Sequence, residues 1–292
     1  MDLPVTTRTW ILRDIKVLHL EPTDVCQAAC ALCARETDRD FDKKSQHHLD
    51  MYKITKVFDV DRIAQLNKMF MCGNYGDPAA GKYTLDIYRE FRSLNKNIVL
   101  GMNTNGGLQN TIWWHELGRI FNQSQDYCVF SIDGLEDTNA TYRQGVDWHR
   151  LMHNVEAYIA AGGSAHWDML VYQHNQHQVN DCERLAKDMG FKWFRAKVSK
   201  RAFTEQLQFP TNWKPIVSNT TSVDCRALKE QSVYIDAKGN IGPCCWLGAR
   251  QKDFVIDIDL IPTQDPMCFA TCGVTSAGTV FDQQWQREVE LC

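Results

Sequence analysis

The sequence lacks any apolar run near the roughly 18 residues that a membrane-spanning helix requires. The N-terminal MDLPVTTRTWILRDIK also lacks the apolar core of a signal peptide. We therefore expect no membrane partner and a cytoplasmic location. An excess of basic residues is missing too, because the formal net charge is −4, which argues against a protein that mainly binds nucleic-acid phosphates. There is no internal repeat and no low-complexity segment, and 292 residues suffice for one large core or one domain with an appendage.

Cysteine, by contrast, is abundant, with 12 residues. Without an export signal, closely spaced cysteines favour metal binding over disulfides. One group lies near the start, at Cys26, Cys30 and Cys33, and a second group lies between Cys225 and Cys292. The middle of the chain holds almost no ligand candidates, so two separate metal centres are the simplest account.

Short apolar runs alternate with amphipathic stretches over the first two-thirds of the chain. The runs predict six strands, and the stretches between them show helical periodicity. Alternation of this kind predicts parallel βαβ units, and six units make an incomplete barrel or an open sheet. We expect an α/β fold with a partial (β/α)6 TIM barrel. The predicted strands are 15–20, 68–72, 97–102, 127–132, 166–172 and 191–198, and the predicted helices are 83–94, 111–123, 147–162 and 177–190.

This alternation stops near residue 200. The segment 209–224 is rich in Pro, Ser, Thr and Asn and is typical of a linker. Beyond it, 232–245 predicts a hairpin and 279–291 predicts a helix. We therefore divide the chain into a core at 1–205, a linker at 206–224 and a small cysteine-rich domain at 225–292.

Cys26, Cys30 and Cys33 directly follow the first predicted strand, at the sheet edge where barrel enzymes and open α/β sheets place their chemistry. A cubane iron–sulfur cluster normally takes four thiolates, so three leave one iron available to an exogenous ligand. On spacing alone, a zinc site completed by a distant His stays open.

The C-x3-C-x2-C spacing after a first strand resembles the radical S-adenosylmethionine (SAM) superfamily. Three further segments resemble that family's motifs in the same order: MCGNYGDP (71–78), MNTNGG (102–107) and FSIDGLEDTNATYRQG (130–145). The resemblance implies a 4Fe–4S cluster on the three cysteines, whose open iron binds SAM. It also implies reductive cleavage of SAM to a 5′-deoxyadenosyl radical that abstracts hydrogen from a substrate. The implied cofactor-binding residues are Gly73, Asn74, Gly76, Asp77, Asn105, Ser131 and Arg143.

The C-terminal cysteines resemble the SPASM/Twitch extension of radical SAM enzymes, which carries auxiliary iron–sulfur clusters. The short tail implies one auxiliary 4Fe–4S cluster, a Twitch-like arrangement. The implied ligands are Cys225, Cys244, Cys268 and Cys272, and either Cys245 or Cys292 could replace one of them. A structural zinc site with four thiolates is the alternative.

Trp193, Arg195 and Lys197 alternate along the sixth predicted strand and so share a face. If this face points into the barrel, Arg195 and Lys197 could bind a substrate carboxylate or phosphate. If it points outward, the two charges are simply solvated.

Together these features predict a radical SAM oxidoreductase that modifies a peptide or protein by epimerisation, crosslinking or oxidation. A radical dehydrogenase of a small molecule such as a sugar is the alternative. A non-enzymatic iron–sulfur or zinc protein for electron transfer or binding is an alternative of another class. The resemblance implies an external electron donor such as a flavodoxin or ferredoxin. The catalytic residue stays open, and a radical-quenching thiol could be Cys72, Cys128, Cys182, Cys245 or Cys292.

Overall fold

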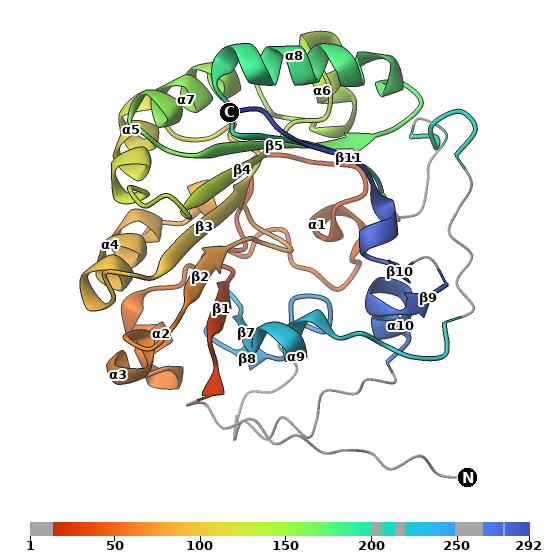
Figure 1. The fold of residues 1–292 in the computed structure, drawn as a ribbon. Coiled ribbons are helices and arrows are strands. Elements are labelled where there is room, and N and C mark those ends of the chain that lie inside the picture. Colours follow the sequence, from red (N-terminus) through yellow and green to blue (C-terminus); the bar gives the residue numbers. More distant parts are fainter. Residues whose placement is uncertain (1–13, 200–204, 206, 214–219, 249–264, 277) are drawn as a thin grey trace.

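The computed structural model describes residues 14–199, 205, 207–213, 220–248, 265–276 and 278–292. Parts of the predicted linker, 206 and 214–219, lie outside these ranges. A curved sheet of nine strands runs through the molecule in the order β11-β6-β5-β4-β3-β2-β1-β7-β8, with α4, α5, α7 and α8 along its outer side (Figure 1). The strands β1 to β6 are parallel to one another. The predicted α/β partial barrel is therefore confirmed.

All six predicted strands and four predicted helices are present, with ends shifted by a few residues. The strands are β1 (Val17–Leu20), β2 (Lys68–Met71), β3 (Val99–Thr104), β4 (Tyr127–Ser131), β5 (Ala165–Val171) and β6 (Trp193–Val198), followed by β7 (Ser232–Ile235), β8 (Ile241–Gly242), β9 (Val274–Thr275), β10 (Gly278–Thr279) and β11 (Trp285–Glu290). The helices are α1 (Ala34–Thr37), α2 (Met51–Val57), α3 (Val60–Ile63), α4 (Thr84–Leu94), α5 (Thr111–Ile120), α6 (Glu136–Tyr142), α7 (Trp148–Ala160), α8 (Val179–Met189), α9 (Arg226–Glu230) and α10 (Pro266–Cys272).

Local sequence explains where the outer helices begin and end. The side chain of Asn110 accepts from the Trp113 N–H at the start of α5, and Asp147 accepts from the Arg150 N–H at the start of α7. These caps satisfy backbone donors that would otherwise lack partners. Helix α8 ends at Gly190, whose φ of 86° is the left-handed conformation that glycine adopts without a Cβ clash.

The main core lies between the sheet and the outer helices. Trp114 of α5, Phe130 of β4, Tyr158 of α7 and Trp167 of β5 are fully buried there. Trp114 packs against both Phe130 and Tyr158, with ring centroids 5.3 and 6.5 Å apart. Aromatic burial of this kind fixes the helices against the sheet and leaves the opposite face of the strands for the site.

No described helix is both long and apolar enough to cross a membrane.

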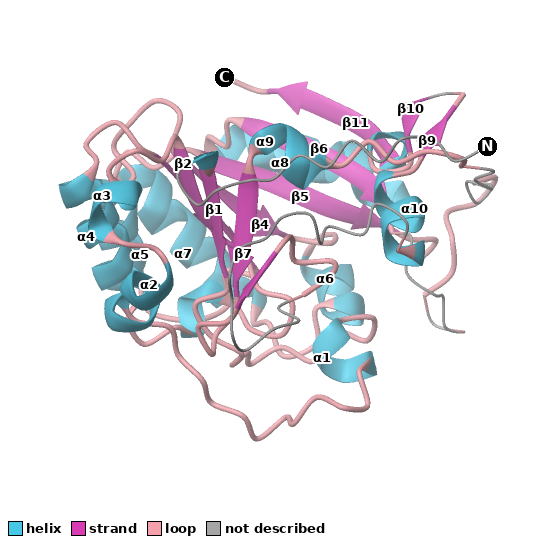
Figure 2. Ribbon diagram, turned by 90° about the horizontal axis from the view of Figure 1, so that it is seen from below, coloured by secondary structure: helices cyan, strands magenta, loops and turns pink. Residues whose placement is uncertain are grey.

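The C-terminal segments add strands to both edges of the core sheet. Strand β7 runs parallel to β1 and forms the predicted hairpin with β8. At the other edge, β11 pairs antiparallel with β6. Helix α10 and the small β9–β10 ribbon lie together, across the molecule from α2, α3 and α4 (Figure 2).

The predicted helix at 279–291 is wrong. Residues 285–290 form strand β11, in which half-buried Trp285, Arg287 and Val289 alternate with exposed residues. The Gln, Arg and Glu residues there favour helix as isolated residues. Pairing with β6 prevails, because strand formation depends mainly on the tertiary surroundings.

Candidate functional site

Three thiols share one site at the C-terminal end of β1. Cys26, Cys30 and Cys33 lie on the loop between β1 and α1, and the Cys33 N–H donates to the Cys30 carbonyl at 2.9 Å. Burial raises the pKa of Cys26 to about 12, with Asp77, Cys30 and Cys33 adding to the rise. Burial also raises the pKa of Cys30, and the neighbouring Cys33 acts in the same direction. The three thiols are therefore electrostatic neighbours.

Residues from other strand ends contact these thiols. The side-chain amide of Asn105, which follows β3, lies 3.6 Å from Cys26 Sγ. The carbonyl of Asn74, which follows β2, lies 3.7 Å from Cys33 Sγ. The guanidinium of Arg143 hydrogen-bonds Cys30 and acts to lower the pKa of its thiol. Three of the predicted SAM-contacting residues thus stand beside the three cysteines.

The loop at 73–76 is packed so closely that its glycines are required. A Cβ on Gly73 would lie 2.0 Å from the Gly76 carbonyl oxygen, and a Cβ on Gly76 would lie 2.0 Å from the Thr23 carbonyl oxygen. Both approaches are to backbone atoms, which cannot rotate away. The predicted glycine motif is therefore a tight turn held against the chain that leads to Cys26.

The carboxylate of Asp77 accepts hydrogen bonds from other residues of the chain. Asp77 is buried, and its carboxylate accepts from the Thr104 hydroxyl at 2.8 Å, the Asn105 N–H at 2.7 Å and the Ala79 N–H at 2.9 Å. Burial raises the pKa of Asp77, whereas these hydrogen bonds act to lower it. Asp77 thus ties the loop after β2 to the loop after β3, and its predicted contact with SAM stays a prediction.

Arg143 and Asp133 form a buried ion pair beside Cys30. Arg143 Nε lies 2.6 Å from Asp133 Oδ2, while Asp133 Oδ1 accepts from the Leu170 N–H at 2.6 Å. Burial acts to lower the pKa of Arg143, but Asp133 and Cys30 raise it above its usual range. The guanidinium is therefore charged, and Asp133 holds it in place through its Nε.

Arg195 and Lys197 lie on the same face of the sheet as Ser131. Ser131 is paired in register with Asp168, and Asp168 with Arg195. The alternate side chains of β6, Phe194 and Ala196, are buried in the core on the helix side. The charged face of β6 therefore points to the inner, concave side of the sheet, which answers the question that the sequence left open.

These two cations differ in their partners. Arg195 Nε lies 2.6 Å from Asp168 Oδ1. The Lys197 ammonium lies 4.4 Å from the centre of the Trp285 ring, and no acid of the described chain forms an ion pair with it. Burial lowers the pKa of Lys197, and Asp168 acts against this shift. Lys197 is thus a half-buried cation held against an aromatic ring of β11.

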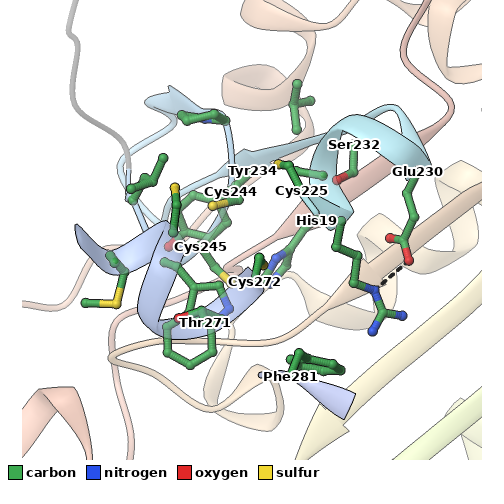
Figure 3. A pocket seen from close by; sticks show the side chains of 18 of the residues that line it. His19, Cys225, Glu230, Ser232, Tyr234, Cys244, Cys245, Thr271, Cys272 and Phe281 are labelled. Carbon is green, nitrogen blue, oxygen red and sulfur yellow. Dashed lines mark hydrogen bonds and ion pairs between the residues drawn. The ribbon is translucent and has the colours of Figure 1, made fainter. Parts of the chain in front are cut away.

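A second group of cysteines lines a pocket between α9, the β7–β8 hairpin and α10 (Figure 3). Cys225 is the N-cap of α9, Cys244 follows β8, and Cys268 and Cys272 lie one turn apart on α10. Burial raises the pKa of Cys268 to about 11, and Cys244, Cys225 and Cys272 also act to raise it. The four predicted auxiliary ligands are therefore brought together from three segments.

The two leftover cysteines of the tail are separated by the fold. Cys245 lines the same pocket, and burial raises the pKa of its thiol, with Cys72 and Cys244 as further causes. Cys292 is exposed, and its sulfur lies 3.3 Å from the Phe191 carbonyl oxygen at the β6 edge. Across the described ranges, no three His, Cys, Asp or Glu side chains converge as ligands of a single metal ion would.

Sequence reasoning missed several residues that border these sites. His19 and Glu21 alternate along β1 and its end, so they share a face, and this was a readable signal. Tyr234 gave no such signal, because its contact with Glu21 spans 213 residues of sequence. Trp285 was missed because it lies in the segment that was wrongly predicted to be a helix.

The chain resembles solved structures in fold. No protein-family model matches the chain, and no curated protein matches it. SuiB from Streptococcus suis is similar with a TM-score of 0.61 at 14% identity, over 88% of this chain and 68% of that chain. It has also been solved bound to S-adenosylmethionine and to the precursor peptide SuiA. Native anSMEcpe with bound AdoMet and Cp18Cys peptide is similar with a TM-score of 0.57 at 14% identity, over 88% of this chain and 80% of that chain. At these identities the likeness shows the fold, a mostly parallel α/β partial barrel.

Proposed function

We propose that this chain is a radical SAM enzyme in which Cys26, Cys30 and Cys33 hold a 4Fe–4S cluster. One observation carries the proposal: Asn74, Asn105 and Arg143, which follow three different elements, each contact a different one of these three thiols. The donor set suits the cluster, because thiolates are the usual ligands of iron–sulfur centres and three of them leave one iron open. SuiB and anSMEcpe, which share the fold, bind SAM.

Cys26, Cys30 and Cys33 would hold the cluster, which would supply the one-electron reduction of SAM to methionine and a 5′-deoxyadenosyl radical. The residues of the chain hold and shield the reactants. Asn74, Gly73 and Gly76 form the tight turn proposed to receive the SAM amino group, and Arg143 is proposed to attract its carboxylate. Ser131 lies on the inner face, where it could meet the ribose, and Asn105 supports Cys26. The electron would come from an external donor such as a flavodoxin or ferredoxin.

We propose that the tail holds an auxiliary 4Fe–4S cluster on Cys225, Cys244, Cys268 and Cys272. Their shared pocket and their mutual effect on pKa support this assignment. Thiolate ligation requires loss of four protons, so metal binding must overcome the raised pKa values of Cys225, Cys244 and Cys268. Cys245 lines the pocket too and is the one alternative ligand among the leftover cysteines that the geometry supports.

We propose that the substrate is a peptide or protein with an anionic group. SuiB and anSMEcpe bind peptides. Arg195 and Lys197 face the inner side of the sheet, where Asp168 balances only one of the two positive charges. A substrate carboxylate would find Lys197 without a competing ion pair from the described chain, and a half-buried site makes such a pair stronger than it would be in water.

Production of 5′-deoxyadenosine tests the function. Anaerobically reconstituted and reduced protein is given SAM alone, SAM with host peptides and proteins, or SAM with host small metabolites, with Cys30→Ala as control. Product that requires Cys30 and rises only with the macromolecular fraction supports peptide modification. A rise only with metabolites would favour a small-molecule dehydrogenase. No product from fully iron-loaded protein would refute radical SAM chemistry.

A further inference from the structure

Glu21 holds the loop at 73–76 through its backbone. Glu21 directly follows β1 and is 1% exposed. Its Oε1 accepts from the Tyr75 N–H at 2.7 Å and from the Gly76 N–H at 3.2 Å. Charge-assisted bonds from backbone N–H groups to a buried carboxylate are stronger than neutral ones. This side chain therefore restrains the turn at two successive backbone N–H groups.

The other oxygen of Glu21 is held by the tail. Oε2 accepts a hydrogen bond from the Tyr234 hydroxyl, and Tyr234 lies on β7, which pairs with β1. The Tyr234 ring packs edge-on against His19 with ring centroids 5.0 Å apart, so its position is set by packing as well. A residue of the C-terminal segment thus completes the hydrogen bonding of the carboxylate that holds the loop.

A second contact joins the same loop to the tail. The Asn74 side-chain N–H donates to the Cys245 carbonyl at 2.7 Å, while the Asn74 carbonyl lies 3.7 Å from Cys33 Sγ. Cys245 neighbours Cys244, which lines the tail pocket. Asn74 therefore stands between the three-cysteine loop and the cysteine-lined pocket of the tail.

We infer that Glu21 and Tyr234 are positioning residues that hold the 73–76 loop ready for SAM, so that the folded tail supports SAM binding in the core. This inference rests on the proposed function for its ligand, but the contacts themselves do not. Without the Tyr234 hydroxyl, the Glu21 carboxylate loses one of its donors in a dry site, and the loop loses part of its restraint. Part of the binding free energy of a ligand that needs the ordered loop is then used to order it, and binding is weaker.

Tyr234→Phe tests the inference, because it removes the hydroxyl and keeps the ring against His19. We expect SAM to bind about tenfold more weakly, the loss that accompanies one buried hydrogen bond to a charged group. We also expect faster amide hydrogen exchange at Tyr75 and Gly76 in protein with an unchanged iron content. Glu21→Gln should retain much of the binding, since its amide carbonyl can still accept from both backbone N–H groups.

Tyr158→Phe is the matched control. Tyr158 is also fully buried, and its hydroxyl contacts the Ser164 carbonyl at 3.5 Å and, within the described part of the chain, does not bond residues 73–76. Normal SAM binding and loop exchange are expected for this variant. The inference is overturned if Tyr234→Phe matches the wild type in both measurements, or if the two variants lose SAM affinity equally. If the wild type itself binds no SAM, the proposed function fails, and the exchange rates of Tyr75 and Gly76 alone decide whether Tyr234 positions the loop.

Discussion

His166 lies on the inner face of β5 in surroundings that disfavour its protonated form. Its ring stacks on Tyr127 with centroids 5.6 Å apart, and Ser164 Oγ lies 3.4 Å from Nε2. Burial, together with the positive charges of Arg195 and Lys192, lowers the pKa of His166 from 6.5 to about 4. The unfolded chain therefore takes up a proton at this residue at a higher pH than the folded chain does.

This difference predicts that acid weakens the fold through His166. Between about pH 6.5 and 4 the unfolded state binds more protons, so stability falls as the pH falls, by up to about 1.4 kcal/mol per pH unit. His166→Asn should remove that part of the pH dependence in urea unfolding measured near pH 7 and near pH 5. His149→Asn is the control, since His149 is exposed on α7. An unchanged slope in His166→Asn would contradict the prediction.

The Arg143–Asp133 pair predicts strong energetic coupling. Arg143→Gln leaves the buried Asp133 carboxylate without its partner, and breaking such a pair typically costs about 3–5 kcal/mol of unfolding free energy. Adding Asp133→Asn should recover part of this loss, because the neutral amide needs no counter-charge. Urea unfolding of both single variants and the double variant gives the coupling. Additive losses would show that the two side chains act independently.

Residues with a local pattern could be predicted from the sequence, and residues defined by distant contacts could not. The three cysteines and Asn74, Asn105 and Arg143 each belong to a short motif after a predicted strand, and the fold brings them together. Tyr234 belongs to no motif, and its partner Glu21 is far away in sequence. Only the pairing of β7 with β1 reveals their contact.

At the scale of single elements, α5 stabilises the protein through the one face that packs on the core. Trp114 is fully buried on this helix, whereas Ile112 is 75% exposed. Trp114→Ala should lower the free energy of unfolding by about 3–5 kcal/mol through lost burial and the cavity left behind. Ile112→Ala should change it by less than about 0.5 kcal/mol. Urea unfolding of the two variants measures the difference, and equal losses would mean that α5 does not pack on the sheet through this face.

Periodicity predicted the helices and strands whose buried and exposed residues alternate in a regular pattern within a short stretch of sequence. The outer helices bury one face against the sheet, so their 3.6-residue pattern is visible in the sequence. Strand β11 lies at a sheet edge with three exposed polar side chains, and its apolar content is small. Its identity depends on pairing with β6, a property of the folded molecule that no short window of sequence contains.

At the scale of the whole molecule, the C-terminal segments and the core share one sheet. Strands β7 and β8 extend one edge of the sheet and β11 extends the other, so the tail adds strands to both ends of the six-stranded core. These pairings join residues far apart in sequence, and the predicted hairpin gave no indication of the strand beside which it would lie. The tail therefore contacts the inner face of the sheet through Trp285, and Tyr234 bonds Glu21, which holds the loop at 73–76.

Two separate groups of thiols predict two independent iron loads. Reconstituted wild-type protein should carry about eight irons, and the Cys26/Cys30/Cys33→Ala variant about four, because each cubane holds four irons. Cys268→Ala with Cys272→Ala should also lower the count to about four, since it removes two of the four tail ligands. Cys182→Ala is the matched control, because this thiol is buried within α8 and belongs to neither group. Iron and sulfide analysis measures the loads. Zinc without sulfide in the tail would show that the tail site is a structural zinc site. An unchanged iron count after loss of Cys26, Cys30 and Cys33 would show that these three cysteines hold no cluster.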